Sequence, residues 1–111
     1  MQKMGIMLSL IGDNRRLVLL IELKATEARI DNTLQIQRYV DWLEQYYVPN
    51  RISDIQPVLI SKKILNKTSE NYKKIIESLK HFNDMNNRCV PIKYVEYELE
   101  GNDLLFKVIN Y

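Results

Sequence analysis

The sequence contains few of the residues that form covalent or metal crosslinks. Its 111 residues include one cysteine, Cys89, and one histidine, His81. A single cysteine excludes an internal disulfide, and one cysteine with one histidine excludes a Cys/His zinc cluster. No apolar run is long enough to span a membrane, and the N-terminus lacks the pattern of a signal peptide. We therefore expect a soluble protein of the reducing cytoplasm with no membrane partner.

A strong excess of charge of either sign is also absent. Sixteen basic and fourteen acidic residues give a formal net charge of +2. Such a balance permits a phosphate-bearing partner but does not require one. The length suits a single domain, 1–111, with one core and one site.

The segment around which the chain is organised is residues 17–24, Leu-Val-Leu-Leu-Ile-Glu-Leu-Lys. Five consecutive aliphatic residues predict a strand buried on both faces. Residues two apart in a strand share a face, so Glu22 and Lys24 point the same way. This charged pair is costly to desolvate unless something such as a metal ion or a phosphate satisfies it. A strand that simply emerges into water is the alternative explanation.

Apolar periodicity and turn residues predict the order ββαβαββ, an α/β fold in which a mixed sheet is flanked by helices. Gly12 to Arg15 should turn the first strand back onto the second as a hairpin. If the third strand lies parallel beside this hairpin, Lys62 and Lys63 finish near Lys24. We expect strands at 4–11, 17–24, 55–60, 94–100 and 104–109, and helices at about 32–47 and from about 70 to 86.

Two stripes run along the first predicted helix, whose cap should be Asp31 or Asn32. The first stripe is apolar and should be buried; it consists of Ile36, Val40, Leu43 and Tyr47. The second lies about 100° around the helix and is amphipathic; it consists of Gln35, Tyr39, Trp42 and Tyr46. The second helix should begin after a cap at Thr68 or Ser69. Its buried face should consist of Tyr72, Ile75, Ile76, Leu79 and Phe82.

A core strand ending in Glu-x-Lys (Glu22, Lys24), followed by a helix with Gln-x-x-x-Tyr (Gln35, Tyr39), resembles the PD-(D/E)XK nuclease superfamily. The resemblance covers roughly residues 4–61. It is greatest to the branches with a Gln-x-x-x-Tyr helix, the exonuclease-like group and the archaeal-type endonucleases that cut branched, mismatched or single-stranded DNA. It implies a restriction-endonuclease-like core, hydrolysis of phosphodiester bonds with Mg²⁺ or Mn²⁺, and DNA, single-stranded or branched, as the partner.

The resemblance also implies roles for individual residues. Glu22 would be a metal ligand and Lys24 the catalytic lysine, which orients the nucleophile or stabilises the developing charge. Gln35 and Tyr39 would position the DNA backbone or a metal-bound water. A basic rim along the path of the phosphates is expected to consist of Lys24, Arg38, Lys62 and Lys63.

The sequence departs from the superfamily pattern at the aspartate of the preceding strand. In a hairpin, the residue numbers of every directly opposed pair add up to the same value. A turn near residues 12–15 therefore puts Gly5, Ile6 or Met7 across from Glu22. Asp13 would be roughly 20–30 Å from Glu22 along an extended strand, and is therefore assigned to the turn. Because the sequence begins almost inside the first predicted strand, we expect it to lack the helix that usually precedes that strand in the superfamily. We therefore expect cleavage to be weak or absent, with the defect at Met7 or its immediate neighbour.

Three interpretations remain open at this point. The first is a metal-dependent DNA nuclease that is weak, or that takes a further ligand from Glu27, Asp31 or a second subunit, which would make it a homodimer. The second is a non-catalytic nucleic-acid-binding or protein-interaction module on the same fold. The third is a small α/β domain with chance motifs. Binding of a divalent metal would separate the first two, and the shape of the Glu22 site would separate both from the third.

Overall fold

The computed structural model describes residues 2–11, 15–46, 55–86 and 89–111. The described elements confirm the predicted order ββαβαββ and the α/β class. They are β1 (Gln2–Ile11), β2 (Arg15–Glu27), α1 (Ile30–Tyr46), β3 (Ile55–Lys62), α2 (Glu70–Met85), β4 (Lys93–Glu100) and β5 (Asp103–Ile109). The predicted turn residues at 12–14, and Tyr47 of the predicted apolar stripe, lie outside the described residues.

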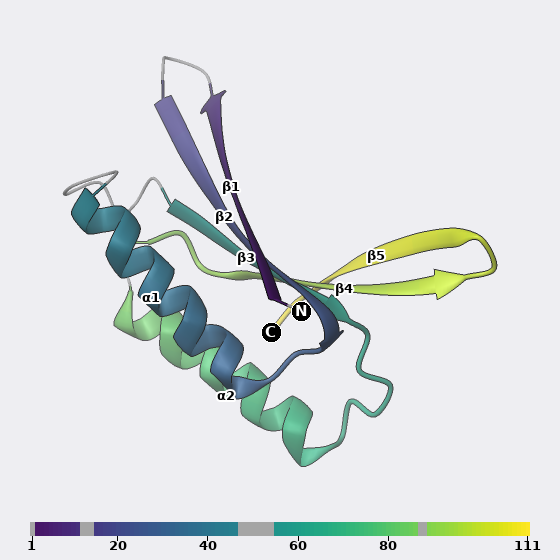
Figure 1. The fold of residues 1–111 in the computed structure, drawn as a ribbon. Helices are drawn as coiled ribbons and strands as arrows, with labels where there is room; N and C mark the ends of the chain where they lie inside the picture. Colours follow the sequence, from purple (N-terminus) through teal and green to yellow (C-terminus); the bar gives the residue numbers. More distant parts are fainter. Residues whose placement is uncertain (1, 12–14, 47–54, 87–88) are drawn as a thin grey trace.

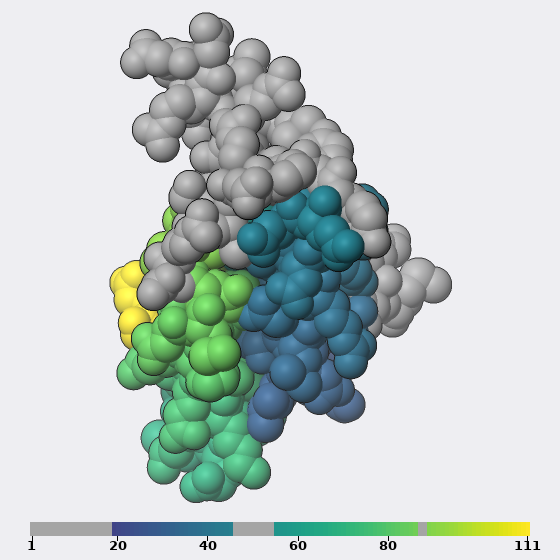
Figure 2. Space-filling view, turned by 90° about the vertical axis from the view of Figure 1, so that its left-hand side faces the viewer, coloured from purple at the N-terminus to yellow at the C-terminus, as the bar shows by residue number. Residues whose placement is uncertain are grey.

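The strands form one mixed five-stranded sheet in the order β1-β2-β3-β4-β5. β2, β3 and β4 are parallel, as the two helical connections between them require, and β1 and β5 are antiparallel to their neighbours. Both helices lie on the same face of the sheet (Figure 1). Figure 2 shows them side by side, with α2 next to α1. The sheet is therefore covered by helices on one face.

The core fills the space between the two helices and the covered face of the sheet. The apolar stripe of α1 and the apolar face of α2 both point inward, as their spacing predicted. The fully buried apolar side chains include Leu20, Ile36, Val40, Leu43, Leu59, Ile75, Leu79 and Tyr94. Tyr39, Tyr72 and Ile76 pack at the border of this core. Among the described residues, no helix is long and apolar enough to cross a membrane.

The helix caps agree with the sequence for α2 and correct it for α1. Ser69 caps α2, because its Oγ accepts a hydrogen bond of 3.2 Å from the Tyr72 N–H. α1 begins at Ile30, so the predicted caps Asp31 and Asn32 lie inside its first turn. Asn32 Oδ1 instead accepts the Arg29 N–H at 2.7 Å. This contact is one of the two hydrogen bonds of a capping box, in which a side chain of the first turn accepts the backbone N–H of the residue before the helix.

The β1–β2 hairpin corrects the predicted register. Met4, and not Gly5, Ile6 or Met7, pairs with Glu22, and Met7 pairs with Leu19. The prediction was wrong because it placed the centre of the hairpin slightly too late along the chain. Moving this centre by one residue changes the residue that pairs with Glu22 by two positions. The residue of β1 that pairs with Glu22 is therefore Met4. It is not an acid, which agrees with the prediction that no acid lies opposite Glu22.

The alternating segment in β4 turns its polar side inward. Tyr94 and Glu96 are buried on the helix-covered face, whereas Val95 and Tyr97 are half-buried on the other face and Leu99 is 74% exposed. The uncovered face of the sheet is therefore largely apolar at this end. β3 pairs with β4 only as far as Lys62 and Tyr97, so the rest of the β4–β5 hairpin projects beyond the helices (Figure 1).

Candidate functional site

Glu22 is a fully buried carboxylate in the middle of the sheet. It shares the helix-covered face with Leu20, two residues earlier, and both side chains have no exposed area. Its neighbour across the β2–β3 ladder is Leu59. Removing a carboxylate from water costs several kcal/mol, so a glutamate persists at such a depth only where its surroundings compensate that cost. The burial excludes the alternative of a strand that simply emerges into water at Glu22.

Lys24 lies where β2 leaves the regular ladder. The pairing of β2 with β3 shifts register between Leu23 and Glu27, and the side chain of Lys24 is half-buried. The Tyr97 hydroxyl, from β4, donates a hydrogen bond of 3.1 Å to the Lys24 carbonyl oxygen. A register shift of this kind re-aims the side chains of the strand. Tyr97 therefore helps to fix the backbone that carries Lys24.

Gln35 and Tyr39 form a hydrogen-bonded pair on α1. The Gln35 Nε2 donates to the Tyr39 hydroxyl oxygen at 3.0 Å, and both side chains are half-buried. Tyr39 packs against the core that Leu20 also lines, so the pair lies on the same side of the sheet as Glu22. Gln35 and Tyr39 are thus on the side of the sheet that carries Glu22. The convergence of Glu22, Lys24, Gln35 and Tyr39 on one pocket, which the resemblance implies, and their roles toward DNA stay predictions; none of the four lines the cleft described below.

The four expected basic residues do not form one continuous rim. Lys62, at the end of β3, is exposed, whereas Lys63 forms an ion pair of 3.3 Å with Glu98 of β4. Arg38 is exposed on α1, two residues from both Ile36 and Val40, and so points away from the sheet. Lys24 and Lys62 come near the carboxyl ends of β2 and β3, but only Lys62 lines the cleft described below.

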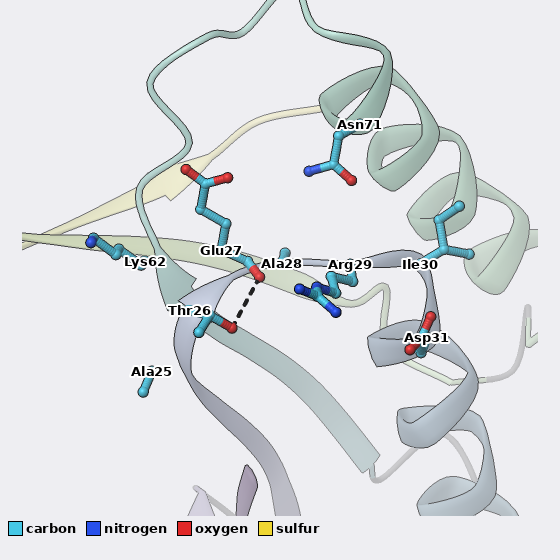
Figure 3. Close-up of a pocket in the computed structure, with 9 residues that line it drawn as sticks. All are labelled: Ala25, Thr26, Glu27, Ala28, Arg29, Ile30, Asp31, Lys62 and Asn71. Carbon is cyan, nitrogen blue, oxygen red and sulfur yellow. Dashed lines mark hydrogen bonds between the residues drawn. The ribbon is translucent and has the colours of Figure 1, made fainter. Parts of the chain in front are cut away.

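An open cleft of about 690 Å³ lies beyond the carboxyl end of β2 (Figure 3). Glu27, from the end of β2, and Asn71, from the first turn of α2, extend into the space between these elements. The other lining residues are Ala25, Thr26, Ala28, Arg29, Ile30, Asp31 and Lys62. The cleft thus holds two acids and two bases. Sequence reasoning named Glu27 and Asp31 only as substitute ligands and did not identify Arg29 or Asn71.

The described acidic residues do not gather into one cluster around the cleft. In the described ranges there is no group of three His, Cys, Asp or Glu residues placed to hold a metal ion. Glu22 is buried under α1, whereas Glu27 and Asp31 line the open cleft. A single carboxylate holds Mg²⁺ weakly, because the ion gives up its water reluctantly.

A second buried carboxylate, Glu96, escaped the sequence analysis. It is 3% exposed and accepts hydrogen bonds from the Ile64 N–H at 3.0 Å, the Tyr94 hydroxyl at 3.0 Å and the Lys67 ammonium at 2.5 Å. Burial, together with the negative charge of Glu96, raises the pKa of Tyr94, so its hydroxyl remains a donor. The one available signal was the polar-apolar alternation of 94–100, which does not say which face is buried. This network joins β4 to the loop before α2.

The structure defines a small α/β domain, with the crossover helices on one face of a mixed sheet. The chain belongs to the family described as the endonuclease NucS C-terminal domain, whose family model matches residues 1–96. Neither the curated proteins nor the solved structures gave a match. The matched range includes Glu22, Lys24, Gln35 and Tyr39 and ends within β4.

Proposed function

We propose that this domain binds DNA at the carboxyl ends of β2 and β3, and that its Glu-x-Lys site hydrolyses phosphodiester bonds weakly or not at all. Membership of an endonuclease family over residues 1–96 is the observation that carries the proposal. The cleft at the ends of β2 and β3 supports the location, because ligands of α/β sheets bind beyond the carboxyl ends of parallel strands.

The residues at this end of the sheet offer several contacts to a phosphate backbone. Lys24 and Lys62 supply positive charge, and Arg29 adds a guanidinium at the wall of the cleft. The first turns of α1 and α2 also border the cleft, and their N–H groups favour an anion. Glu27 and Asp31 oppose this attraction. We infer that DNA binding is moderate and is led by phosphate contacts rather than by a strongly basic surface.

Gln35 and Tyr39 suit a positioning role in this proposal. The Tyr39 oxygen accepts from Gln35, so the tyrosine proton is free to be donated to a further acceptor, such as a phosphate oxygen. The tyrosine is also held by packing against the core. A preorganised donor of this kind orients a substrate without losing much side-chain entropy on binding.

Weak cleavage follows from the acid that is absent from the Glu22 row. Mg²⁺ or Mn²⁺ is the cofactor that the superfamily resemblance implies, and it would supply an activated water. The residue paired with Glu22 is Met4, and the described residues offer no three-ligand group. The unmodified chain is therefore proposed to bind DNA first and to cleave it poorly.

The register determines the rescue experiment. Met4→Asp introduces a carboxylate in the row of Glu22, whereas Met7→Asp introduces one three rows away, about 10 Å along the strand. Cleavage of single-stranded and branched DNA is measured with Mg²⁺ and with Mn²⁺. We expect Met4→Asp to create cleavage that Lys24→Ala or Glu22→Ala removes, and the matched control Met7→Asp to remain as slow as the unmodified chain.

Two results would contradict the proposal. If the unmodified chain cuts at an ordinary enzyme rate and Glu22→Ala abolishes cutting, another acid already completes the site, and Glu27→Ala and Asp31→Ala identify it. If neither the unmodified chain nor Met4→Asp binds or cuts any DNA, the domain has a different partner.

A further inference from the structure

The β4–β5 hairpin carries an apolar surface that is unusual for the end of a small domain. Five large apolar residues on it are between 42% and 74% exposed: Leu99, Leu104, Leu105, Phe106 and Val108. At roughly 150–200 Å² for each side chain, this is about 400–500 Å² of exposed apolar area. The hairpin projects beyond the helices, so neither α1 nor α2 shields it (Figure 1). Four of these residues, Leu99, Leu104, Phe106 and Val108, share one face of the hairpin, and Leu105 lies on the other. An exposed apolar patch of this kind marks an interaction surface.

The outer strand of this hairpin is also an edge. β5 is the last strand of the sheet and pairs only with β4, so one side of its backbone has no strand partner in the described sheet. Natural proteins usually protect such an edge with charge, proline or a covering segment, because it readily pairs with another strand. β5, Asp103–Ile109, contains no proline and only two charged residues, Asp103 and Lys107.

The positions of these two charges select a partner strand. Asp103 and Lys107 lie at equal distances on either side of Leu105. If a second β5 pairs antiparallel with Leu105 opposite its counterpart, each Asp103 faces a Lys107 of the other copy on the same face of the sheet. On the other face, Leu104 meets Phe106. A shift of two residues in either direction removes the match of charges.

We propose that β5 pairs with β5 of a second copy of this chain, which forms a two-fold symmetric dimer with a continuous ten-stranded sheet. The interface is isologous, because one self-complementary strand supplies both halves. In the described part of the monomer neither Asp103 nor Lys107 forms an ion pair, so both are available to the partner. The inference does not depend on the proposed DNA site.

The area that β5 can bury sets the expected affinity of the dimer. A standard interface buries about 800 Å² per partner, of which somewhat more than half is apolar. Pairing along the edge of β5 covers only part of the exposed apolar area, because the side chains point to the two faces of the sheet and Leu99 lies on the inner strand. The dimer should therefore be at the weak end of specific association, with a micromolar dissociation constant.

Charge reversal with rescue tests the pairing and its register. Sedimentation velocity follows the full chain from roughly 1 to 500 µM, a range that brackets micromolar dissociation. Asp103→Lys and Lys107→Asp each set like charges opposite one another at two symmetric places, and should each weaken the dimer about tenfold or more. The double variant Asp103→Lys/Lys107→Asp restores opposite charges and should dimerise nearly as well as the unmodified chain.

Matched controls separate this register from a general effect of charge. Asp84→Lys and Lys80→Asp make the same changes in net charge on the exposed surface of α2, and should leave the dissociation constant unchanged. Leu105→Cys should crosslink two copies under oxidation, whereas Glu100→Cys, outside the paired segment, should not. The native Cys89 is buried and does not compete.

The proposal is overturned by any of three results. The first is that the unmodified chain sediments as a monomer over the whole range, which leaves the hairpin to a different partner. The second is that the dimer is insensitive to both single reversals, which places the interface elsewhere. The third is that the double variant fails to recover while circular dichroism shows that it is folded, which excludes the pairing centred on Leu105.

Discussion

Replacing Glu96 by alanine should destabilise the domain more than any change at its surface ion pairs. The substitution removes a 3% exposed carboxylate that accepts three hydrogen bonds. It leaves the Ile64 N–H and the Tyr94 hydroxyl without an acceptor in a buried environment. It also removes the partner of Lys67, whose side chain is 36% exposed and can regain water.

The size of the effect follows from these contacts. Leaving a buried donor unsatisfied costs about 1–3 kcal/mol, and two donors are affected. Breaking a buried charged pair by removing one partner costs about 3–5 kcal/mol. Because Lys67 is partly solvated, we expect a loss of about 3–4 kcal/mol for Glu96→Ala. This is a large fraction of the free energy of unfolding of a small domain, which is about 5–15 kcal/mol.

Urea denaturation followed by circular dichroism measures this loss, and the same strand provides the control. Glu98 forms an ion pair with Lys63 at 3.3 Å, but both side chains are about two-fifths exposed. Glu98→Ala should therefore cost only about 0–1 kcal/mol. Equal losses for Glu96→Ala and Glu98→Ala would refute the reasoning, because burial would then not distinguish the two carboxylates.

Two further predictions concern DNA binding and the buried thiol. DNA affinity should fall steeply between about 50 and 200 mM salt, and an affinity independent of salt would contradict a phosphate-led contact. Lys62→Ala should reduce the slope of log affinity against log salt concentration by about 1. Lys63→Ala should change this slope less, because the Lys63 ammonium pairs with Glu98. Burial raises the pKa of Cys89 from its ordinary value near 9 to about 12, so its contribution to stability is present below about pH 9 and is lost as the pH rises toward 12. The urea midpoint should accordingly fall more between pH 8 and 10.5 in the unmodified chain than in Cys89→Ala, and equal falls would show that the thiol is not protected.

The local pattern of the sequence determined most of the elements of this fold. Hydrophobic periodicity placed all seven helices and strands within a few residues of their observed bounds, because burial of one face imposes a period on each element. The cap of α2 at Ser69, one of the two predicted candidates, and the inward stripe of α1 followed from the same local physics. The α/β class then followed from the order of the elements, since parallel neighbours need a crossover and the helices provide it.

The candidate site was only partly visible in the sequence. The order of Glu22, Lys24, Gln35 and Tyr39 led to the nuclease resemblance, and the family match over residues 1–96 agrees with a nuclease-related domain. The part of Tyr97 in holding the Lys24 carbonyl could not be read, because the two residues are 73 positions apart and meet only across β3. The expected basic rim was divided for a similar reason: the outward direction of Arg38 and the pairing of Lys63 with Glu98 depend on how α1 and β4 pack against the sheet.

Two features were decided by the tertiary structure alone. Alternation in 94–100 showed that the two faces of β4 differ, but only the packing of the helices decided that Glu96 is buried and that Leu99 faces solvent. The sequence likewise showed that β1 and β2 form a hairpin, whereas the register that pairs Met4 with Glu22 was set by the geometry of the whole ladder. In both cases the local pattern is compatible with two arrangements of nearly equal local energy, and long-range burial selects one of them.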